Sequence, residues 1–352
     1  MKKFILFGVL SFLMLTGAFA QTDSIVFYNG NYVVGEVKSM NRGTLTVETD
    51  YSDSDFKIEW DKIKEIYTVT YFLITTSDGN RYNGHVNTSE PGKIMISTSD
   101  GQKVEAVHDD IVWLDDIDKG FWSKLYASID VGLDLTKANN FSQFSTRATV
   151  GYLAERWNLD ATYNTLFSSQ DEVEDIKRTD GGIGYKYFLP KDWYPLVSVD
   201  FLSNNEQKLD LRTTGKAGLG KFVTHTNYAY WGFSLGANYN NETFLPNTVS
   251  DINGNDSTYT EPGRKSWEGF LGTELNLFDI GDLNLSTKLF AYPSFTESGR
   301  WRADFNFDAK YDMPFDDDFY IRLGVTFNYD NMPVEGASET DYVMSTGFGW
   351  QW

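Results

Sequence analysis

The 352-residue sequence contains no cysteine, only three histidines and only eight prolines. The absence of cysteine excludes disulfides, a cysteine nucleophile, cysteine-ligated metals and a lipid anchor on an N-terminal cysteine. Long apolar runs are also missing after residue 20, where nothing approaches the roughly 18 consecutive apolar residues of a transmembrane helix. A helical membrane protein is therefore excluded.

Basic charge is scarce as well. The chain has 30 Lys and Arg against 50 Asp and Glu, which gives a formal net charge of −20. Such an acidic surface disfavours nucleic acid as a partner. Aromatic residues, in contrast, make up 16% of the chain, and there are 30 glycines. This composition suits a β-rich membrane protein with aromatic girdles.

Residues 1–20 are typical of a secretory signal peptide. Lys2 and Lys3 form a charged start, residues 4–15 form an apolar run, and Ala18 to Ala20 form a small-x-small cleavage site. The apolar run is too short to remain as a membrane-spanning helix. We therefore expect export and cleavage before Gln21.

Residues 21–120 contain a duplicated pattern, with copies at about 23–67 and 72–118. When the two copies are aligned at an offset of 49 residues, identical residues fall at several positions. Among them are Gly30, Gly35, Val37, Gly43 and Thr49 in the first copy and Gly79, Gly84, Val86, Gly92 and Thr98 in the second. Asn-Gly and Asp-Gly turns between apolar runs predict β-hairpins in each copy. We expect a periplasmic domain of two small SH3-like or Sm-like β units, packed together or fused into one sheet, because each is too small for its own core. The domain either binds a partner or serves as a structural base.

Residues 121–352 alternate between apolar and polar positions, as the strands of a transmembrane barrel do. About twelve such runs are present, at 124–136, 141–153, 156–168, 178–189, 195–204, 208–224, 227–240, 266–278, 283–296, 300–313, 319–330 and 341–352. An antiparallel outer-membrane β-barrel is predicted, with ten or fourteen strands as alternatives. Short turns are expected on the periplasmic side and longer external loops, of which 241–265 is expected to be mobile. The rival fold is a soluble, secreted all-β protein.

The final strand strengthens the prediction of a membrane barrel. It places large apolar groups at alternate positions and ends on an aromatic pair, which in a soluble protein would form an aggregation-prone edge. In a membrane barrel this face meets lipid, and the strand serves insertion by the barrel-insertion machinery. The residues concerned are Tyr342, Met344, Phe348, Trp350 and Trp352.

The polar face of the predicted strands carries charges of both signs. These predicted lumen residues are Asp130, Asp134, Arg147, Asp160, Lys186, Asp200, Arg212, Lys216, Glu274, Lys288, Asp304, Asp308, Lys310 and Arg322. They would either line a narrow pore, with basic and acidic sides that face each other, or form salt bridges that fill the lumen.

The sequence offers little for catalysis or for a cofactor. The three histidines, His85, His108 and His225, fall in the N-terminal repeat or at a turn expected on the periplasmic side. A barrel hydrolase needs its catalytic groups at the outer face. Acidic runs such as Asp316 to Asp318 lack EF-hand spacing and are interpreted as solvated turns. We expect no enzyme activity, no cofactor and no metal.

Residues 120–352 resemble a family of bacterial outer-membrane proteins of unassigned function, some described as salt-induced. The resemblance rests on glycine-rich strands at 181–185 and 215–220 and on the Gly-Phe-Gly-Trp-Gln-Trp ending. It implies the location and the fold and supplies no catalytic residues.

Three functions remain open from the sequence. The first is a non-enzymatic outer-membrane channel or envelope scaffold, with outer-membrane lipid around it. The second is a membrane-anchored binding protein whose periplasmic domain docks an envelope protein or cell-wall material. The third is an outer-membrane hydrolase.

Overall fold

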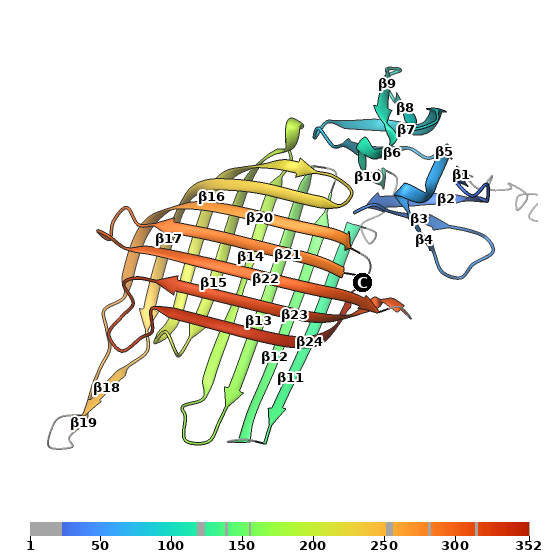
Figure 1. Cartoon of the computed structure of the whole chain (residues 1–352). Helices are drawn as coiled ribbons and strands as arrows, with labels where there is room; N and C mark the ends of the chain where they lie inside the picture. Colours follow the sequence, from blue (N-terminus) through green and yellow to red (C-terminus); the bar gives the residue numbers. More distant parts are fainter. Residues whose placement is uncertain are drawn as a thin grey trace, which may run out of the picture.

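The computed structural model of the chain describes residues 23–117, 124–137, 140–154, 156–250, 256–280, 283–313 and 316–351. The predicted signal peptide and Trp352 lie outside these residues. The described chain has two main β structures, an N-terminal sheet and a larger closed barrel, and the sheet lies beside one end of the barrel (Figure 1). No helix among the described residues is long and apolar enough to cross a membrane.

Each copy of the N-terminal repeat folds as four strands, a 3₁₀ turn and a fifth strand. The first copy contains β1 (Asp23–Phe27), β2 (Tyr32–Asn41), β3 (Thr44–Glu48), β4 (Phe56–Glu59), η1 (Trp60–Lys62) and β5 (Ile63–Tyr67). The second contains β6 (Phe72–Thr76), β7 (Arg81–Glu90), β8 (Lys93–Thr98), β9 (Lys103–Val107), η2 (His108–Asp110) and β10 (Ile111–Asp116). The duplicated sequence thus produces a duplicated order of elements.

The two copies form one ring of strands instead of two separate units. Within the described residues, the pairing order β1, β5, β7, β6, β10, β2 returns to β1, so three strands from each copy close the ring. The remaining strands extend from β2 and β7 as hairpins. The copies are therefore fused into one sheet. An SH3-like or Sm-like unit is not confirmed, because each copy needs the other to close its ring.

The ring encloses a single apolar core to which both copies contribute at matching positions. Ile25 and Val37 of the first copy are fully buried beside Ile74 and Val86 of the second. The first residues of η1 and η2 also meet. The rings of Trp60 and His108 stack with centroids 4.4 Å apart, and Trp60 Nε1 donates a hydrogen bond to the backbone carbonyl of His108 at 3.0 Å.

The barrel has the twelve antiparallel strands predicted from the sequence, counted over the described residues. They are β11 (Leu125–Thr136), β12 (Phe141–Leu153), β13 (Trp157–Ser169), β14 (Ile176–Tyr187), β15 (Trp193–Asn204), β16 (Leu209–His225), β17 (Ala229–Phe244), β20 (Arg264–Ile280), β21 (Leu283–Pro293), β22 (Trp301–Met313), β23 (Asp316–Asp330) and β24 (Thr340–Gln351). The last strand pairs with the first through Phe348 and Val131, which closes the barrel.

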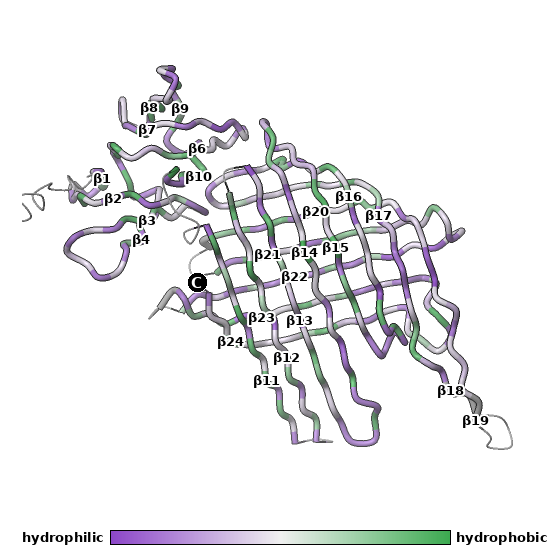
Figure 2. Tube along the Cα trace, turned by 180° about the vertical axis from the view of Figure 1, so that it is seen from behind, coloured by the Kyte–Doolittle hydropathy of each residue, from purple (hydrophilic) through white to green (hydrophobic). Residues whose placement is uncertain are grey.

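The barrel's outer face is apolar. Hydrophobic and hydrophilic residues alternate along its strands (Figure 2), and on β11 the alternate residues Ile129, Val131, Leu133 and Leu135 are exposed. Exposed tryptophans lie near both ends of the strands, at Trp193, Trp231 and Trp350 near one end and at Trp267 and Trp301 near the other. On β24, the insertion-strand residues Tyr342, Met344, Phe348 and Trp350 are all exposed.

The expected loop at 241–265 is largely structured. β17 continues to Phe244, β20 begins at Arg264, and a hairpin of β18 (Asn247–Ser250) and β19 (Asp256–Tyr259) lies between them. The strands extend because Glu242 and Arg264 lie opposite each other in the ladder and form an ion pair. Apolar periodicity does not detect a strand end that is stabilised by charge.

Candidate functional site: the barrel lumen

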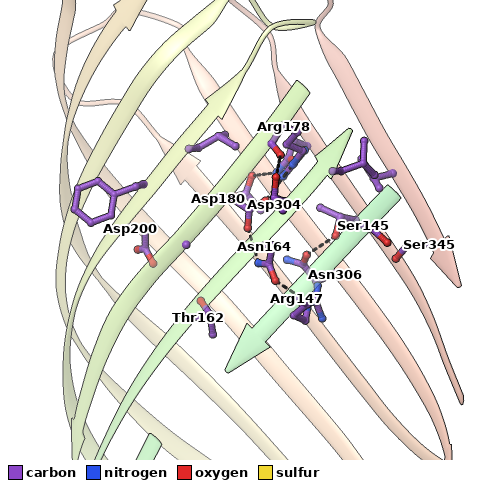
Figure 3. A pocket seen from close by; sticks show the side chains of 18 of the residues that line it. Ser145, Arg147, Thr162, Asn164, Arg178, Asp180, Asp200, Asp304, Asn306 and Ser345 are labelled. Carbon is purple, nitrogen blue, oxygen red and sulfur yellow. Dashed lines mark hydrogen bonds and ion pairs between the residues drawn. The ribbon is translucent and has the colours of Figure 1, made fainter. Parts of the chain in front are cut away.

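Polar side chains of neighbouring strands meet inside the barrel because the strands pair in register. Asp130 of β11 lies opposite Arg147 of β12, which lies opposite Asn164 of β13, which lies opposite Asp180 of β14. Residues opposite each other share one face of a sheet. This row borders a cavity of about 270 Å³. The side chains that line the cavity project from several strands (Figure 3).

Seven of the fourteen charged residues predicted for the lumen line this cavity. They are Asp130, Arg147, Asp200, Arg212, Lys216, Asp304 and Arg322. Hydroxyl and amide side chains such as Ser145, Thr162, Asn306 and Ser345 complete the polar lining. The cavity is therefore suited to small polar molecules or water.

The other seven predicted residues lie outside the cavity lining. They are Asp134, Asp160, Lys186, Glu274, Lys288, Asp308 and Lys310. Glu274 joins two of them, because it accepts hydrogen bonds from Lys186 at 3.4 Å and Lys288 at 3.2 Å. Asp308 pairs with Arg322 as well as Arg147.

The last three of these residues have neighbours of different kinds. Lys310 forms an ion pair with Asp312 at 3.2 Å. Asp134 accepts a hydrogen bond from Gln143 at 3.4 Å, and Asp160 lies opposite glycines of both neighbouring strands.

Several ion pairs between described residues cross the lumen. Arg178–Asp341 at 2.6 Å, Arg147–Asp308 at 3.1 Å and Lys186–Glu274 at 3.4 Å each join strands that are four positions apart in the barrel order. Arg212–Asp330 at 3.7 Å joins strands that are five positions apart. Of the two arrangements expected from the sequence, these contacts favour salt bridges over two separate sides of opposite charge.

A buried ion network lies at the distal end of the barrel, the end far from the N-terminal domain (residues 23–117). Glu242 accepts hydrogen bonds from Arg212 and Arg264 at 2.6 Å and from Arg300 at 3.0 Å. Arg300 also pairs with Asp330 at 2.6 Å, and both Glu242 and Arg300 have 0% exposure. A second pair, Arg302–Glu268 at 2.7 Å, adjoins them.

Several of these residues are absent from the predicted set. Arg302 and Asp330 lie on the polar face of the predicted strands, so continuing the alternation to the strand ends would have included them. Glu242 and Arg264 were assigned to a loop, and Arg300 lies just before β22. The alternation of apolar and polar residues does not show which charged residues at the strand ends form ion pairs with each other.

The proximal end of the lumen, next to the N-terminal domain, is filled by aromatic rings packed on glycines. A Cβ atom at Gly220 would overlap the ring of Tyr194, and one at Gly349 would overlap the ring of Tyr320. Glycine is required there because the ring lies directly on the opposite backbone. This explains part of the glycine richness of the barrel strands.

The rings at the proximal end contact one another in a chain. Ring centroids are 5.0 Å apart for Tyr194 and Phe222, 6.1 Å for Phe222 and Tyr230, and 4.8 Å for Tyr230 and Phe278. Phe188 continues the chain, 6.5 Å from Tyr194. The residues form an aromatic rim around part of the proximal mouth.

The N-terminal domain places one arginine from each copy on this rim. The guanidinium of Arg42 lies 4.8 Å from the ring centroid of Phe278, and that of Arg81 lies 4.9 Å from that of Phe188. Both distances fit cation–π contacts. Burial at this junction lowers the pKa of Arg81 to about 10, which leaves it charged at neutral pH.

Backbone contacts reinforce the junction. The side-chain amide of Asn227, in the turn between β16 and β17, donates to the carbonyl of Ile111 at 2.9 Å. The backbone N–H of Lys191, in the turn between β14 and β15, donates to the carbonyl of Gly79 at 3.3 Å. The two barrel turns therefore hold the domain over the mouth.

Arg42 occupies an unusual backbone position. It lies with Gly43 in the turn between β2 and β3, with φ values of 52° and 75°. Two consecutive positive φ angles match the type I′ hairpin turn, whose first central position favours Asn, Asp or Gly. An arginine at that position costs stability that Asn would not.

The histidines have structural contacts. His85 Nδ1 lies 3.0 Å from the carbonyl oxygen of Thr70, and His108 stacks on Trp60. His225 Nδ1 lies 2.8 Å from a carboxylate oxygen of Asp192 at the proximal mouth. Over the described residues, no three His, Asp or Glu side chains gather as a metal site.

The family profile described as Protein of unknown function, DUF481, matches residues 129–352, more than half of the sequence, and the chain belongs to this family. This agrees with the resemblance to a family of unassigned function, while the salt-induced type stays a prediction. A search of curated proteins finds no match.

The similarity to solved structures is low. The NanC porin is 12% identical, with 64% of this chain and 97% of that chain covered and a TM-score of 0.34. The translocator domain of autotransporter NalP from Neisseria meningitidis is 14% identical, with 65% and 88% covered and a TM-score of 0.38. CdiB from Acinetobacter baumannii is 10% identical, with 89% and 58% covered and a TM-score of 0.37.

Proposed function

We propose that this DUF481 protein is a non-enzymatic, narrow outer-membrane channel for small polar solutes, closed at rest by its own N-terminal domain. The observation that carries the proposal is a polar cavity inside a closed barrel whose proximal mouth holds Arg42 and Arg81 of that domain. The domain then lies in the periplasm, and the distal end faces the outside.

The outer face supports a membrane location. A closed barrel satisfies its backbone hydrogen bonds within the ladder, which is a condition for crossing a bilayer as β-structure. Its exposed side chains are apolar between two sets of tryptophans, which matches the lipid-facing band and aromatic girdles of outer-membrane barrels. In water the same surface would be a large exposed apolar patch.

The lumen supports passage of small solutes only. Ion pairs such as Arg178–Asp341 span it and reduce the free cross-section. Most charges near the cavity have partners of opposite sign, so neither anions nor cations are strongly preferred. Small neutral or zwitterionic polar molecules fit this lining best.

The junction with the N-terminal domain supports closure. The contacts of Arg42 and Arg81 are cation–π contacts worth about 0.5–1 kcal/mol each, and the hydrogen bonds from Asn227 and Lys191 add about 1 kcal/mol each. Contacts of this strength allow the domain to move away without unfolding. A permanent plug would be expected to have stronger contacts.

Single-channel current in planar bilayers tests the proposal with the full chain. In the double variant Arg42→Asn and Arg81→Gln we expect openings roughly tenfold more frequent than in the native protein, because the two lost contacts are worth about 1.4 kcal/mol and that free energy changes an equilibrium tenfold. Asn suits the positive φ of position 42, so the turn is retained. The matched control is Tyr32→Gln, at the position of the first copy that corresponds to Arg81.

The alternative function is an envelope scaffold, which the cross-lumen ion pairs also fit. No current in the native protein and in the double variant would reject the channel and leave the scaffold. Equal currents in all three proteins would keep the channel but reject closure by the domain.

A further inference from the structure

The outer face of the first repeat copy carries a group of exposed aromatic and aliphatic side chains, called here the tyrosine face. Tyr32 is 72% exposed and Tyr51 is 66% exposed. The face consists of Tyr28, Tyr32, Val34, Tyr51 and Tyr67. Phe56, which lies opposite the core residue Val47, borders the face through its contact with Tyr51. Exposed large side chains in such number on one small domain indicate an interaction surface.

Strand pairing makes this face continuous. Val34 of β2 lies opposite Ser24 of β1, and Ser24 lies opposite Tyr67 of β5, so the three share one row. The hydroxyl of Tyr51 donates to the carbonyl of Val34 at 3.4 Å. The ring of Tyr51 lies 6.1 Å from that of Phe56.

The second copy uses the matching face differently. Its corresponding row is Asn83, Leu73 and Asp115. Leu73 and Asp115 are buried, although Leu73 is not part of the ring core. The adjoining residues Gly79 and Arg81 contact the barrel. This face of the second copy therefore lies toward the barrel.

The duplication places the two faces on opposite sides of the domain. β6 and β10 lie on the side toward the barrel, and β1 and β5 lie on the far side (Figure 1). One face is thus docked, and its counterpart, the tyrosine face, points away from the barrel. At the docked face the domain supplies Arg81 and the barrel supplies the aromatic ring of Phe188.

We propose that the tyrosine face docks a basic segment of another envelope protein. Here the domain would supply the aromatic rings and the partner the cations, the reverse of the junction with the barrel. Tyrosine rings attract Arg and Lys side chains by cation–π contact. Residues 23–67 contain nine acidic against five basic residues, which adds charge complementarity. The exposed side chains of Asp50, Asp53 and Asp55 flank Tyr51 and Phe56.

A protein partner fits better than a glycan strand or a lipid surface. The net negative charge of the first copy selects for cations and would repel anionic lipid headgroups. β4 is also an edge strand over the described residues, since it pairs only with β3. A free edge next to aromatic side chains suits the addition of an extended peptide segment.

Site-specific photocrosslinking in intact cells tests this proposal on the full chain. A photoreactive amino acid replaces Tyr51 in one variant and Asp100, the matching exposed residue of the second copy, in the control. We expect a protein adduct from position 51 that position 100 does not give, with Lys or Arg close to the crosslinked residue of the partner. Tyr32→Ser in the position-51 variant should reduce the adduct at least fivefold.

Four outcomes would overturn the proposal. They are equal adducts from both positions, adducts only to glycan or lipid, partner peptides without basic residues, and a yield that Tyr32→Ser does not change. All are independent of whether the barrel conducts, so failure here leaves the channel proposal standing.

Discussion

The two ends of the barrel lumen differ in their chemistry. At the distal end, charged residues from neighbouring strands form a buried network around Glu242 and Arg300. At the proximal end, aromatic rings pack on glycines and meet the arginines of a separate domain. The distal network belongs to the barrel wall, whereas the proximal contacts join the barrel to the N-terminal domain.

This difference shows which end is suited to regulation. Removing one partner from a buried ion network leaves other charges unpaired, so that network is costly to open. Cation–π contacts at a partly exposed junction are weaker and reversible. We therefore propose the proximal mouth as the gate, with the distal network as a fixed part of the barrel wall.

The largest effect is expected at the distal network. Glu242→Ala leaves Arg212, Arg264 and Arg300 with Asp330 in place of two shared carboxylates, and we expect a loss of about 3–5 kcal/mol in the free energy of unfolding. Unfolding in guanidinium, followed by tryptophan fluorescence, measures it. Asp134→Asn, at a partly exposed site, is the control, with an expected change below about 0.5 kcal/mol. Similar losses in both variants would contradict a special role of the network.

A smaller effect is expected at the proximal end. Gly220→Ala forces the ring of Tyr194 to move, which typically costs about 1–3 kcal/mol. Gly215→Ala on the same strand is the matched control, since a Cβ there meets nothing within 4 Å. The same unfolding experiment applies. If the two alanine variants are equally stable, ring-on-glycine packing does not contribute to this end.

A third prediction concerns the pairs that cross the lumen between the two ends. A double-mutant cycle with Arg178→Met and Asp341→Leu should give a coupling energy of about 1–2 kcal/mol, because the 2.6 Å contact is charged on both sides. The double variant should also conduct more current than the native protein. A coupling near zero would mean that the two side chains do not brace the barrel.

The sequence predicts the barrel more completely than the site. On β11, β13, β22 and β23 the alternation of apolar and polar residues indicates a lipid-facing side. Each such run predicts one strand, so the number of strands can be counted from the sequence. The lumen partners do not follow, because a pair such as Arg178–Asp341 depends on which strands face each other across the barrel.

The N-terminal domain shows the same limit of the sequence. The repeat at an offset of 49 predicts a duplicated fold. It does not show that β5 pairs with β7 and β10 with β2, which close one ring from both copies. Neither does it show that Arg42 and Arg81 contact the barrel, since that depends on how the domain docks.

The smallest effect is expected at the domain junction. Arg81→Gln removes one cation–π contact of about 0.5–1 kcal/mol, so amide hydrogen exchange in the turn between β6 and β7 should rise roughly two- to fivefold. Tyr32→Gln, the corresponding change in the first copy, should leave that exchange unchanged because Tyr32 is exposed. Equal protection in all three proteins would show that Arg81 does not hold the domain at the mouth. The domain would then be held at the mouth by Arg42 and by the hydrogen bonds to the carbonyls of Gly79 and Ile111. In that case the proximal contacts would be as hard to break as the distal network.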